Sequence, residues 1–487
     1  MSSPTAEAGQ PRPSPAAHSG HSPRAAHLGL GAFARAHPLW YTWRAGQLPN
    51  APDAPDAPDW TYTGFTGRTP TVAQTLARQD FRYTVLQRGP DGDSAEVVDV
   101  LDAAHAAGDT NALLDVFAHE DLGIVTLTVT ESGYRRRTDG ELDRDDPAVA
   151  ADLAELGDAD HSGRAPGPLA TVPARLVAGL AARREAGGSG LAVLSCDNLA
   201  ANGPTLRRVV LAAAAGLLRS GRYGGLTDWL DRNVSFPATM VDRIVPKTGA
   251  SDIERAAQLT GWTDPATVVA EPFAEWVIAG DFPAGRPDWG AVGAELVDDV
   301  SPYEDRKLWL LNGGHSLLAY TGPARGHTTI AEAAGDRNCR ADLDALWDCI
   351  GPFLRFPTEQ ITAYREQLLD RFTNPGIRHE LAQVGGSGSQ KLAVRIVPLV
   401  RRFLDRGQPV PAPLTGVLGA WLAHLRGLGF PVDDPRADDF VNAAQGPVGD
   451  AARAVLTKLA PDLADSAAVV SAVADASIDL ERLAATG

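Results

Sequence analysis

Residues 26–37, AHLGLGAFARAH, carry the pattern that decides the fold of the N-terminal half of the chain. A short apolar run at 26–28 is followed by Gly29, Gly31 and Ala34 in a GxGxxA arrangement. A helical stretch then runs to about Leu48, in which Pro38 is acceptable as a first-turn residue. In a strand-turn-helix context such glycines let the backbone approach a pyrophosphate at the helix N-terminus. The stretch therefore predicts a dinucleotide-binding unit.

The segments that follow alternate between strand and helix. Strands are expected at 60–65, 81–87, 124–130 and 191–195, and helices at 70–79, 110–119 and 172–186. The β-branched run 124–130 is typical of a buried parallel strand. This alternation predicts an α/β fold with an N-terminal Rossmann-type doubly wound domain.

Helical patterns dominate from about residue 300, which predicts a mainly α-helical C-terminal domain. The helical windows are 304–320, 326–335, 340–350, 357–373, 393–405, 411–428, 448–459 and 464–483. We expect a disordered tail at 1–24, a dinucleotide-binding domain at 25–297 and a helical substrate and catalytic domain at 298–487. The repeated Ala-Pro-Asp triplets at 51–59 predict an extended surface loop, because three prolines in nine residues fit neither a helix nor a central strand.

Composition excludes several classes of protein. The 487 residues carry 44 Lys and Arg against 61 Asp and Glu, a net charge of −17 with no basic stripe, so a nucleic-acid partner is excluded. The sequence shows no long apolar run and no secretory signal, which argues against a membrane span or secretion. The three cysteines form no CxxC pair and the eleven histidines no HExxH motif. We therefore expect a cytoplasmic, metal-free enzyme.

The choice between NAD and NADP stays open at this point. An acidic residue usually ends the second strand of such a domain and binds the ribose hydroxyls. Here residues 63–69 are TGFTGRT, with no carboxylate. Arg68 could meet the 2′-phosphate of NADP, or could be a solvated surface charge.

The stretch 301–315, SPYEDRKLWLLNGGH, supplies candidate catalytic groups. On a helix Lys307, Leu311 and His315 lie at i, i+4 and i+8, with Asn312 one position from that line. A buried lysine could take the proton of a secondary alcohol, with Asn312 as a neutral donor to the alkoxide and His315 orienting the substrate. Glu304, one turn earlier, could relay the proton. An exposed lysine, a cap-like asparagine and a packed histidine fit the spacing equally well.

Several blocks together resemble the long-chain mannitol dehydrogenase family of mannitol 2-dehydrogenases, fructuronate reductases and related polyol and uronate dehydrogenases. They recur in family order and are HLGLGAFARAH (27–37), TLTVTESGY (126–134), SCDNLAANG (195–203), FPATMVDRIVP (236–246), EPFAEWVI (271–278), GRPDW (285–289) and KLWLLNGGHSLLAY (307–320). The resemblance implies a metal-independent enzyme that interconverts a secondary alcohol and a ketone with a nicotinamide cofactor, NAD or, alternatively, NADP. Because this family contains monomers, a monomer is the default expectation.

The resemblance also assigns roles to individual residues. It implies that Lys307 is the general base, that Asn198 and Asn312 stabilise the alkoxide, that His315 also holds substrate, and that Asp242 is a supporting carboxylate. The cofactor-binding residues that it implies are Gly29, Gly31, Phe33, Thr130 and Glu131. Arg68, near the end of the second expected strand, is added to them as a candidate cofactor-binding residue.

Departures from the family pattern fall on the substrate side. Family members that act on mannitol carry an arginine eight residues before a substrate-binding lysine; here Lys391 matches the lysine, but Gln383 stands at the arginine position. Gln383 resembles the fructuronate reductases, and Lys391 suits a substrate carboxylate. D-mannonate/D-fructuronate and D-mannitol/D-fructose are thus the favoured pairs. A mannitol-1-phosphate type dehydrogenase and a non-catalytic nucleotide-binding sensor are the alternatives.

Overall fold

The computed structural model describes residues 24–48, 60–67, 69–217 and 221–486. The predicted tail at 1–24 lies outside these residues except for Arg24, which begins the first strand. The predicted loop at 51–59 and the candidate cofactor residue Arg68 also lie outside them.

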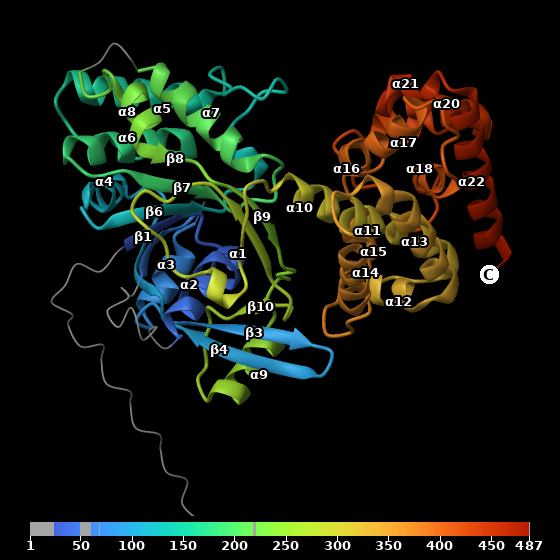
Figure 1. The fold of residues 1–487 in the computed structure, drawn as a ribbon, viewed down its shortest axis with the longest axis horizontal. Helices are drawn as coiled ribbons and strands as arrows, with labels where there is room; N and C mark the ends of the chain where they lie inside the picture. The colour runs from blue at the N-terminus through green and yellow to red at the C-terminus, as the bar shows by residue number, and fades with distance from the viewer. Residues whose placement is uncertain (1–23, 49–59, 68, 218–220, 487) are drawn as a thin grey trace, which may run out of the picture.

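A parallel sheet of six strands forms the centre of the N-terminal domain within the described residues (Figure 1). Its order is β5-β2-β1-β6-β7-β8, with every neighbouring pair parallel. This is the 3-2-1-4-5-6 order of a doubly wound dinucleotide-binding fold. The strands are β1 (Arg24–Leu28), β2 (Thr61–Phe65), β5 (Leu101–His105), β6 (Leu122–Leu127), β7 (Leu191–Ser195) and β8 (Val234–Ser235).

Helices cover both faces of this sheet. Val125 and Leu127 of β6 pack on the side of Phe117 and Leu176, whereas Ile124 packs on the opposite side, because successive side chains of a strand point to opposite faces. The first face carries α4 (Thr110–Ala118), α5 (Pro147–His161), α6 (Val172–Glu185), α7 (Asn202–Ala215) and α8 (Leu226–Asn233). The second carries α1 (Ala32–Ala36), α2 (Pro38–Gly46) and α3 (Thr71–Ala77). The predicted fold class is confirmed.

Two predicted elements differ in detail. The helical stretch expected to end near Leu48, with Pro38 in its first turn, corresponds to α2, because the proline ring suits a first helical position. The structure adds a separate short helix, α1, before it, and the two helices break at His37, whose φ is −133°. The strand expected at 124–130 ends at Leu127, because Thr130 takes a positive φ of 65° and the chain turns away from the sheet edge.

Two small sheets that contain antiparallel pairs extend the domain, and only one of their strands, β3, corresponds to an expected strand, the one at 81–87. In one small sheet, β3 (Tyr83–Gly89) forms a hairpin with β4 (Gly92–Val98) and pairs with β10 (Val268–Ala270), beside α9 (Ala250–Thr260). In the other, β9 (Ala238–Asp242) lies antiparallel to β11 (Glu275–Ala279), which pairs with β12 (Glu295–Leu296). The register of the second sheet sets Asp242 opposite Glu275.

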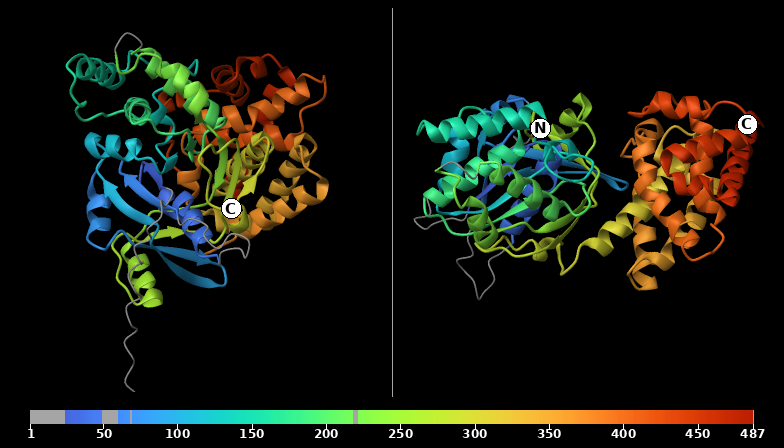
Figure 2. Two further views of the ribbon diagram at one scale, coloured as in Figure 1. Left: turned by 60° about the vertical axis from the view of Figure 1, so that its left-hand side comes forward. Right: turned by 90° about the horizontal axis from the view of Figure 1, so that it is seen from above.

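The C-terminal domain is largely helical in its described part (Figure 2). It packs around α11 (Gly313–Thr321), all of whose residues are buried. The chain enters it through α10 (Ser301–Arg306) and a π-helix, Lys307–Asn312. The other helices of four or more residues are α12 (Ile330–Gly335), α13 (Arg337–Ile350), α14 (Thr358–Phe372), α15 (Leu381–Gly385), α16 (Gly388–Arg395), α17 (Val397–Leu404), α18 (Ala412–Leu425), α19 (Ala437–Ala443), α20 (Val448–Leu459), α21 (Pro461–Ala464) and α22 (Ala467–Thr486). None of the helices in the described ranges has the length and apolar character of a membrane span.

Candidate functional site

A cavity of about 670 Å³ lies between the two domains, at the carboxyl ends of β1 and β6. The strand order reverses between these two strands, and doubly wound folds bind their ligands at such switch points. Gly29 follows β1 with φ +94°, and a Cβ atom there would lie 2.2 Å from the Thr128 carbonyl oxygen, so only glycine fits. Gly31 differs, because a Cβ atom there would lie 3.6 Å from the Gly29 oxygen, an ordinary contact.

Asp197 fixes the backbone that follows β6 and lines the cavity opposite the glycine loop. Its Oδ1 accepts the backbone N–H groups of Val129 and Thr130 at 2.9 and 2.8 Å, and its Oδ2 accepts the Tyr134 hydroxyl at 2.8 Å. These bonds fix the positive φ of Thr130, a costly conformation for a β-branched residue. Asp197 had no predicted role, although it lies inside the SCDN block next to Asn198.

The π-helix brings Lys307 and Asn312 to the same cavity. In an α-helix five residues turn by about 500°, which would separate these side chains by about 140° around the axis. A π-helix bonds residue i to i+5, so five residues make only slightly more than one turn, and both residues line the cavity with His315. The regular helix expected over 304–320 is therefore wrong at 307–312, and the extra residue in this turn is what gathers the three side chains.

The Lys307 ammonium nitrogen reaches across to the N-terminal domain. Nζ lies 2.8 Å from Asn198 Oδ1 and 2.6 Å from the Val241 carbonyl oxygen. The side chain is buried, and burial lowers its pKa below the ordinary value; the Asp242 carboxylate opposes this shift without cancelling it. A lysine that gives up its proton more easily than usual, inside a cavity, is suited to act as a base.

Asp242 is held by Arg371 of α14 in a buried network. The guanidinium nitrogens lie 2.6 and 3.1 Å from the Asp242 oxygens, and 3.0 and 2.8 Å from the oxygens of Glu271. Burial by itself would raise the pKa of the Asp242 carboxyl, but the positive charges of Arg371 and Lys307 outweigh it, and the pKa is lowered. Asp242 is therefore an anion beside Lys307 and ties the two domains together.

The far end of the cavity is lined by the C-terminal domain. His315 is buried between the rings of Phe372 and His379, at centroid distances of 4.6 and 5.2 Å. Burial lowers its pKa well below the usual value, so the imidazole is neutral, and its Nε2 has no hydrogen-bond partner among the described residues. A buried polar atom without a partner at a cavity wall is suited to receive a ligand hydroxyl.

Two cations and an amide complete this end. Lys391 Nζ donates to the Val384 carbonyl at 2.9 Å, and burial lowers its pKa to about 8. Arg395, which the sequence did not indicate, donates to the Asn312 carbonyl at 3.1 Å and to Ser316 Oγ at 3.0 Å. Gln383 lies on the same wall.

The structure gathers the predicted site residues that it describes around this one cavity. They are Gly29, Gly31, Phe33, Thr130, Glu131, Asn198, Asp242, Lys307, Asn312, His315, Gln383 and Lys391. Arg68 lies outside the described residues. Sequence reasoning missed three residues of the site, Asp197, Arg371 and Arg395. The partners of their side chains lie 63 or more residues away in the sequence, so no local pattern indicated them.

A Rossmann domain whose crevice is closed by a helical domain carrying a buried lysine is the architecture of a two-domain oxidoreductase. Two family models match the chain, the mannitol dehydrogenase Rossmann domain at residues 23–291 and the mannitol dehydrogenase C-terminal domain at 299–481. The chain belongs to the mannitol dehydrogenase family, which confirms the predicted family and the predicted class of enzyme.

Individual relatives agree with this membership. The chain is 35% identical over 470 residues to a D-mannonate oxidoreductase of Escherichia coli, covering 94% of this chain and 93% of the relative. It is 34% identical over 435 residues to a mannitol 2-dehydrogenase of Pyrenophora tritici-repentis, covering 87% and 74%. Its structure is similar to that of a Pseudomonas fluorescens mannitol 2-dehydrogenase in ternary complex with NAD and D-mannitol, with a TM-score of 0.77, 31% identity and coverage of 96% and 93%.

Proposed function

We propose that this protein is an NAD-dependent, metal-independent dehydrogenase that interconverts a secondary alcohol of an aldonate or sugar alcohol and the corresponding ketone. Residues 25–297 would bind the cofactor and residues 298–487 the substrate. The observation that carries the proposal is the position of Lys307, whose amine is buried in the same cavity as the glycine loop and holds two acceptors from the opposite domain.

The space around Gly31 in the glycine loop gives a reason to expect NAD in this cavity. Gly31 could accept a Cβ atom without a clash inside the protein, so its lack of a side chain leaves room for something that the chain does not supply. The pyrophosphate of a dinucleotide is the group that approaches such a glycine most closely. The relative of known structure binds NAD, and its cofactor supports the same choice here. When bound, the nicotinamide would supply the hydride acceptor or donor.

Gly31→Ala is expected to weaken NAD binding by tenfold or more while leaving the fold intact. The added methyl group has space in the protein but would occupy the approach of the pyrophosphate. Fluorescence titration with NADH and thermal unfolding measure the two quantities separately. Gly29→Ala is the contrasting variant, because its clash with Thr128 lowers the unfolding temperature as well. Unchanged NADH affinity in Gly31→Ala would contradict the placement of the cofactor.

The hydrogen bonds of Lys307 leave one position for the substrate. A neutral amine has two N–H donors and one lone pair, and the two donors are taken by Asn198 Oδ1 and the Val241 oxygen. The lone pair is then free to accept the hydroxyl proton as the hydride leaves the carbon. In the reverse direction, the third N–H of the ammonium donates to the carbonyl oxygen.

In this proposal Asn198 and Asn312 stabilise the negative charge on the reacting oxygen. Because Asn198 Oδ1 accepts from Lys307, its Nδ2 group is the part of the amide that remains as a donor. Asn312 lines the same cavity from the π-helix. Neutral amide donors held at fixed positions around the reacting oxygen stabilise a developing alkoxide without reorganisation.

The proton has a route away from Lys307. A second cavity of about 600 Å³ shares Lys307 and Asn312 with the first and is also lined by Glu304. Burial raises the pKa of the Glu304 carboxyl, and its Oε1 accepts the Ala201 backbone N–H at 3.0 Å. A carboxyl that titrates closer to neutrality can pass the proton to solvent.

Within this reaction type, an aldonate such as D-mannonate is the favoured substrate. Lys391 and Arg395 place two positive charges at the end of the cavity remote from the glycine loop, where a terminal carboxylate would lie. Gln383 replaces the arginine of the mannitol-specific pattern. The sequence identity to the D-mannonate oxidoreductase supports the same choice, whereas D-mannitol is the second candidate, favoured by the structural relative.

Lys391→Met is expected to raise KM for D-mannonate by about 10- to 100-fold and to change KM for D-mannitol much less. A hydrogen bond to a charged group contributes about 1.5–3 kcal/mol, and only the aldonate carries the charge. The kinetic constants are measured with both substrates and both cofactors, which also tests NADP. An equal change of KM for the two substrates would refute recognition of a carboxylate by Lys391.

Adding mannitol 1-phosphate to these two substrates separates the alternatives. Activity only with a phosphorylated polyol would identify a sugar-alcohol phosphate dehydrogenase. Binding of NADH without turnover of any substrate would identify a nucleotide-binding sensor.

A further inference from the structure

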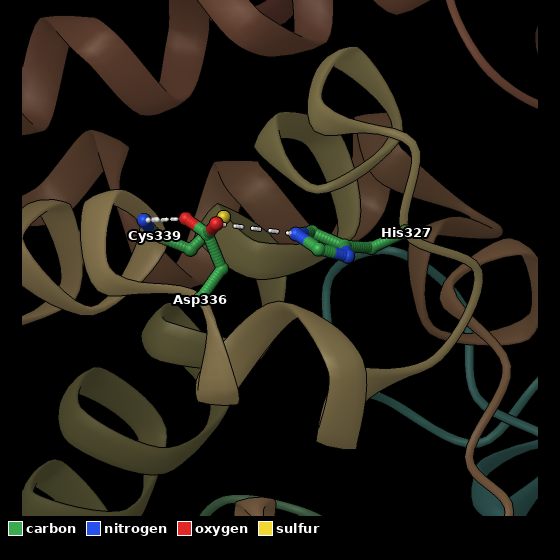
Figure 3. A group of neighbouring side chains, drawn as sticks. All are labelled: His327, Asp336 and Cys339. Carbon is green, nitrogen blue, oxygen red and sulfur yellow. Dashed lines mark hydrogen bonds and ion pairs between the residues drawn. The ribbon is translucent and has the colours of Figure 1, made fainter.

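A group of three potential metal ligands lies outside the catalytic cavity, where α12 meets α13 (Figure 3). His327 precedes α12, Asp336 is the N-cap of α13, and Cys339 lies in its first turn. One ligand atom from each residue lies within 4.8 Å of the other two. Among the described residues this is the only such group of three or more histidine, cysteine or acidic side chains.

Helix capping alone does not account for the arrangement. Asp336 caps α13 through Oδ1, which accepts the backbone N–H groups of Asn338 and Cys339 at 2.9 Å. Its Oδ2 is 3.6 Å from His327 Nε2, an ion-pair distance when the imidazole is protonated but too long for a hydrogen bond (Figure 3). The Nε2 atom is buried and has no hydrogen-bond partner in the described chain. One carboxylate oxygen and one imidazole nitrogen are therefore left facing each other beside a buried sulfur.

We propose that His327, Asp336 and Cys339 form a binding site for a divalent metal ion of the zinc class, with water as the fourth ligand. Imidazole, thiolate and carboxylate are the three protein ligands that Zn²⁺ takes, whereas Ca²⁺ and Mg²⁺ select oxygen ligands. At bond lengths of about 2.0–2.3 Å the ligand atoms of a tetrahedral site lie about 3.5 Å apart. Here they lie within 4.8 Å of one another, so side-chain movements of about an ångström would complete the site.

Charge and access both suit this ion. A dication with one carboxylate and one thiolate is neutral, which removes the penalty of burying its charge. The side chains of His327 and Asp336 are 22% and 26% exposed, while Cys339 is fully buried, so the ion enters from solvent and meets the sulfur last. Zinc takes cysteine as the thiolate, so binding releases the thiol proton to solvent.

The site would support one wall of the catalytic cavity. Residues after His327 hydrogen-bond to the segment that carries His379: the Ile330 N–H donates to the His379 carbonyl and the Leu381 N–H to the Thr328 carbonyl, both at 2.9 Å. A metal ion on His327 would therefore join the start of α13 to the segment leading into α15. This role is structural and does not depend on the proposed dehydrogenase activity.

Cobalt titration of the full-length protein, freed of metal by chelator, tests the site without substrate or cofactor. We expect one Co²⁺ per chain, with the absorption of a cobalt-thiolate bond, and displacement of the Co²⁺ by Zn²⁺. Cys339→Ser should lose the thiolate band, whereas Cys349→Ser, a matched control on the same helix, should keep it. Absence of the band in the unaltered protein, or its persistence in Cys339→Ser, would overturn the proposal.

A second variant guards against a folding defect. Asparagine caps helices as well as aspartate does, so Asp336→Asn preserves the start of α13 but removes the anionic ligand. Its affinity for Co²⁺ should fall by at least about tenfold, and Zn²⁺ should raise its unfolding temperature less than that of the unaltered protein. Unchanged affinity in this folded variant would equally refute the site.

Discussion

Lys307→Ala is expected to lower kcat for alcohol oxidation by about 10³- to 10⁴-fold while NADH binding is retained. General-base catalysis typically contributes about 10²–10⁴ to a rate, and the alanine variant also loses the ammonium that would polarise the carbonyl in reduction. The buried amine contacts Asn198 and Val241 and is placed in the cavity beside the glycine loop. Stopped-flow measurement of NADH formation and NADH fluorescence titration give the two quantities.

The pH dependence provides an independent readout of the same group. Oxidation needs the neutral amine, so its rate rises with pH through the pKa of Lys307, and reduction needs the ammonium and falls through it. Because burial lowers that pKa, oxidation should begin to rise below the pH of about 10.4 at which a free lysine titrates. The rise should vanish in Lys307→Ala, and small primary amines added to the buffer should restore part of the rate.

Lys391→Met is the matched control, because it removes a second buried lysine from the same cavity. It should leave the pH-dependent rise of kcat in place and act mainly on KM. Near-normal kcat in Lys307→Ala, or the same pH profile in both variants, would show that Lys307 is not the base.

The sequence predicted the fold well where the signals are local. Two examples are the β-branched run in β6 and the glycines after β1, whose patterns involve only residues close together in the sequence. The structure has a strand at the first and a tight turn at the second. The helix break at His37 and the π-helix at 307–312 were not predicted, because both depend on how packed elements constrain the backbone. No residue type marks a π-helix in the way that proline or glycine marks a turn.

The candidate site likewise contains residues that local sequence could predict and others that only the three-dimensional packing reveals. Lys307, Asn312 and His315 could be selected because they lie close together in the sequence and match a family pattern. Arg371 could not, since an arginine on a helix is usually a solvated charge and its two partners lie 129 and 100 residues away. Only the buried hydrogen bonds of Arg371 to Asp242 and Glu271 in the other domain reveal that this arginine belongs to the site.

Arg371→Leu is expected to lower the free energy of unfolding by about 3–5 kcal/mol. The substitution keeps an apolar stem but leaves the buried carboxylates of Asp242 and Glu271 without their cation, and breaking a buried ion pair by removing one partner costs about that much. Urea unfolding followed by circular dichroism measures the loss. Arg378→Leu is the control, because Arg378 pairs with Glu380 on the surface and is 77% exposed, so its loss should leave stability nearly unchanged.

The pH dependence of this loss identifies its cause. With Arg371 present, the pKa of Asp242 is lowered in the folded state, so its contribution to stability is present above the pKa of the unfolded carboxyl and is lost as pH falls through the folded one. Without Arg371 the pKa of both carboxyls rises, and protonation relieves the buried charges. The difference in stability between the two proteins should therefore be largest near neutral pH and shrink towards acid pH. A difference that stays constant with pH would assign the effect to packing, and would remove the argument that Arg371 keeps Asp242 ionised beside Lys307.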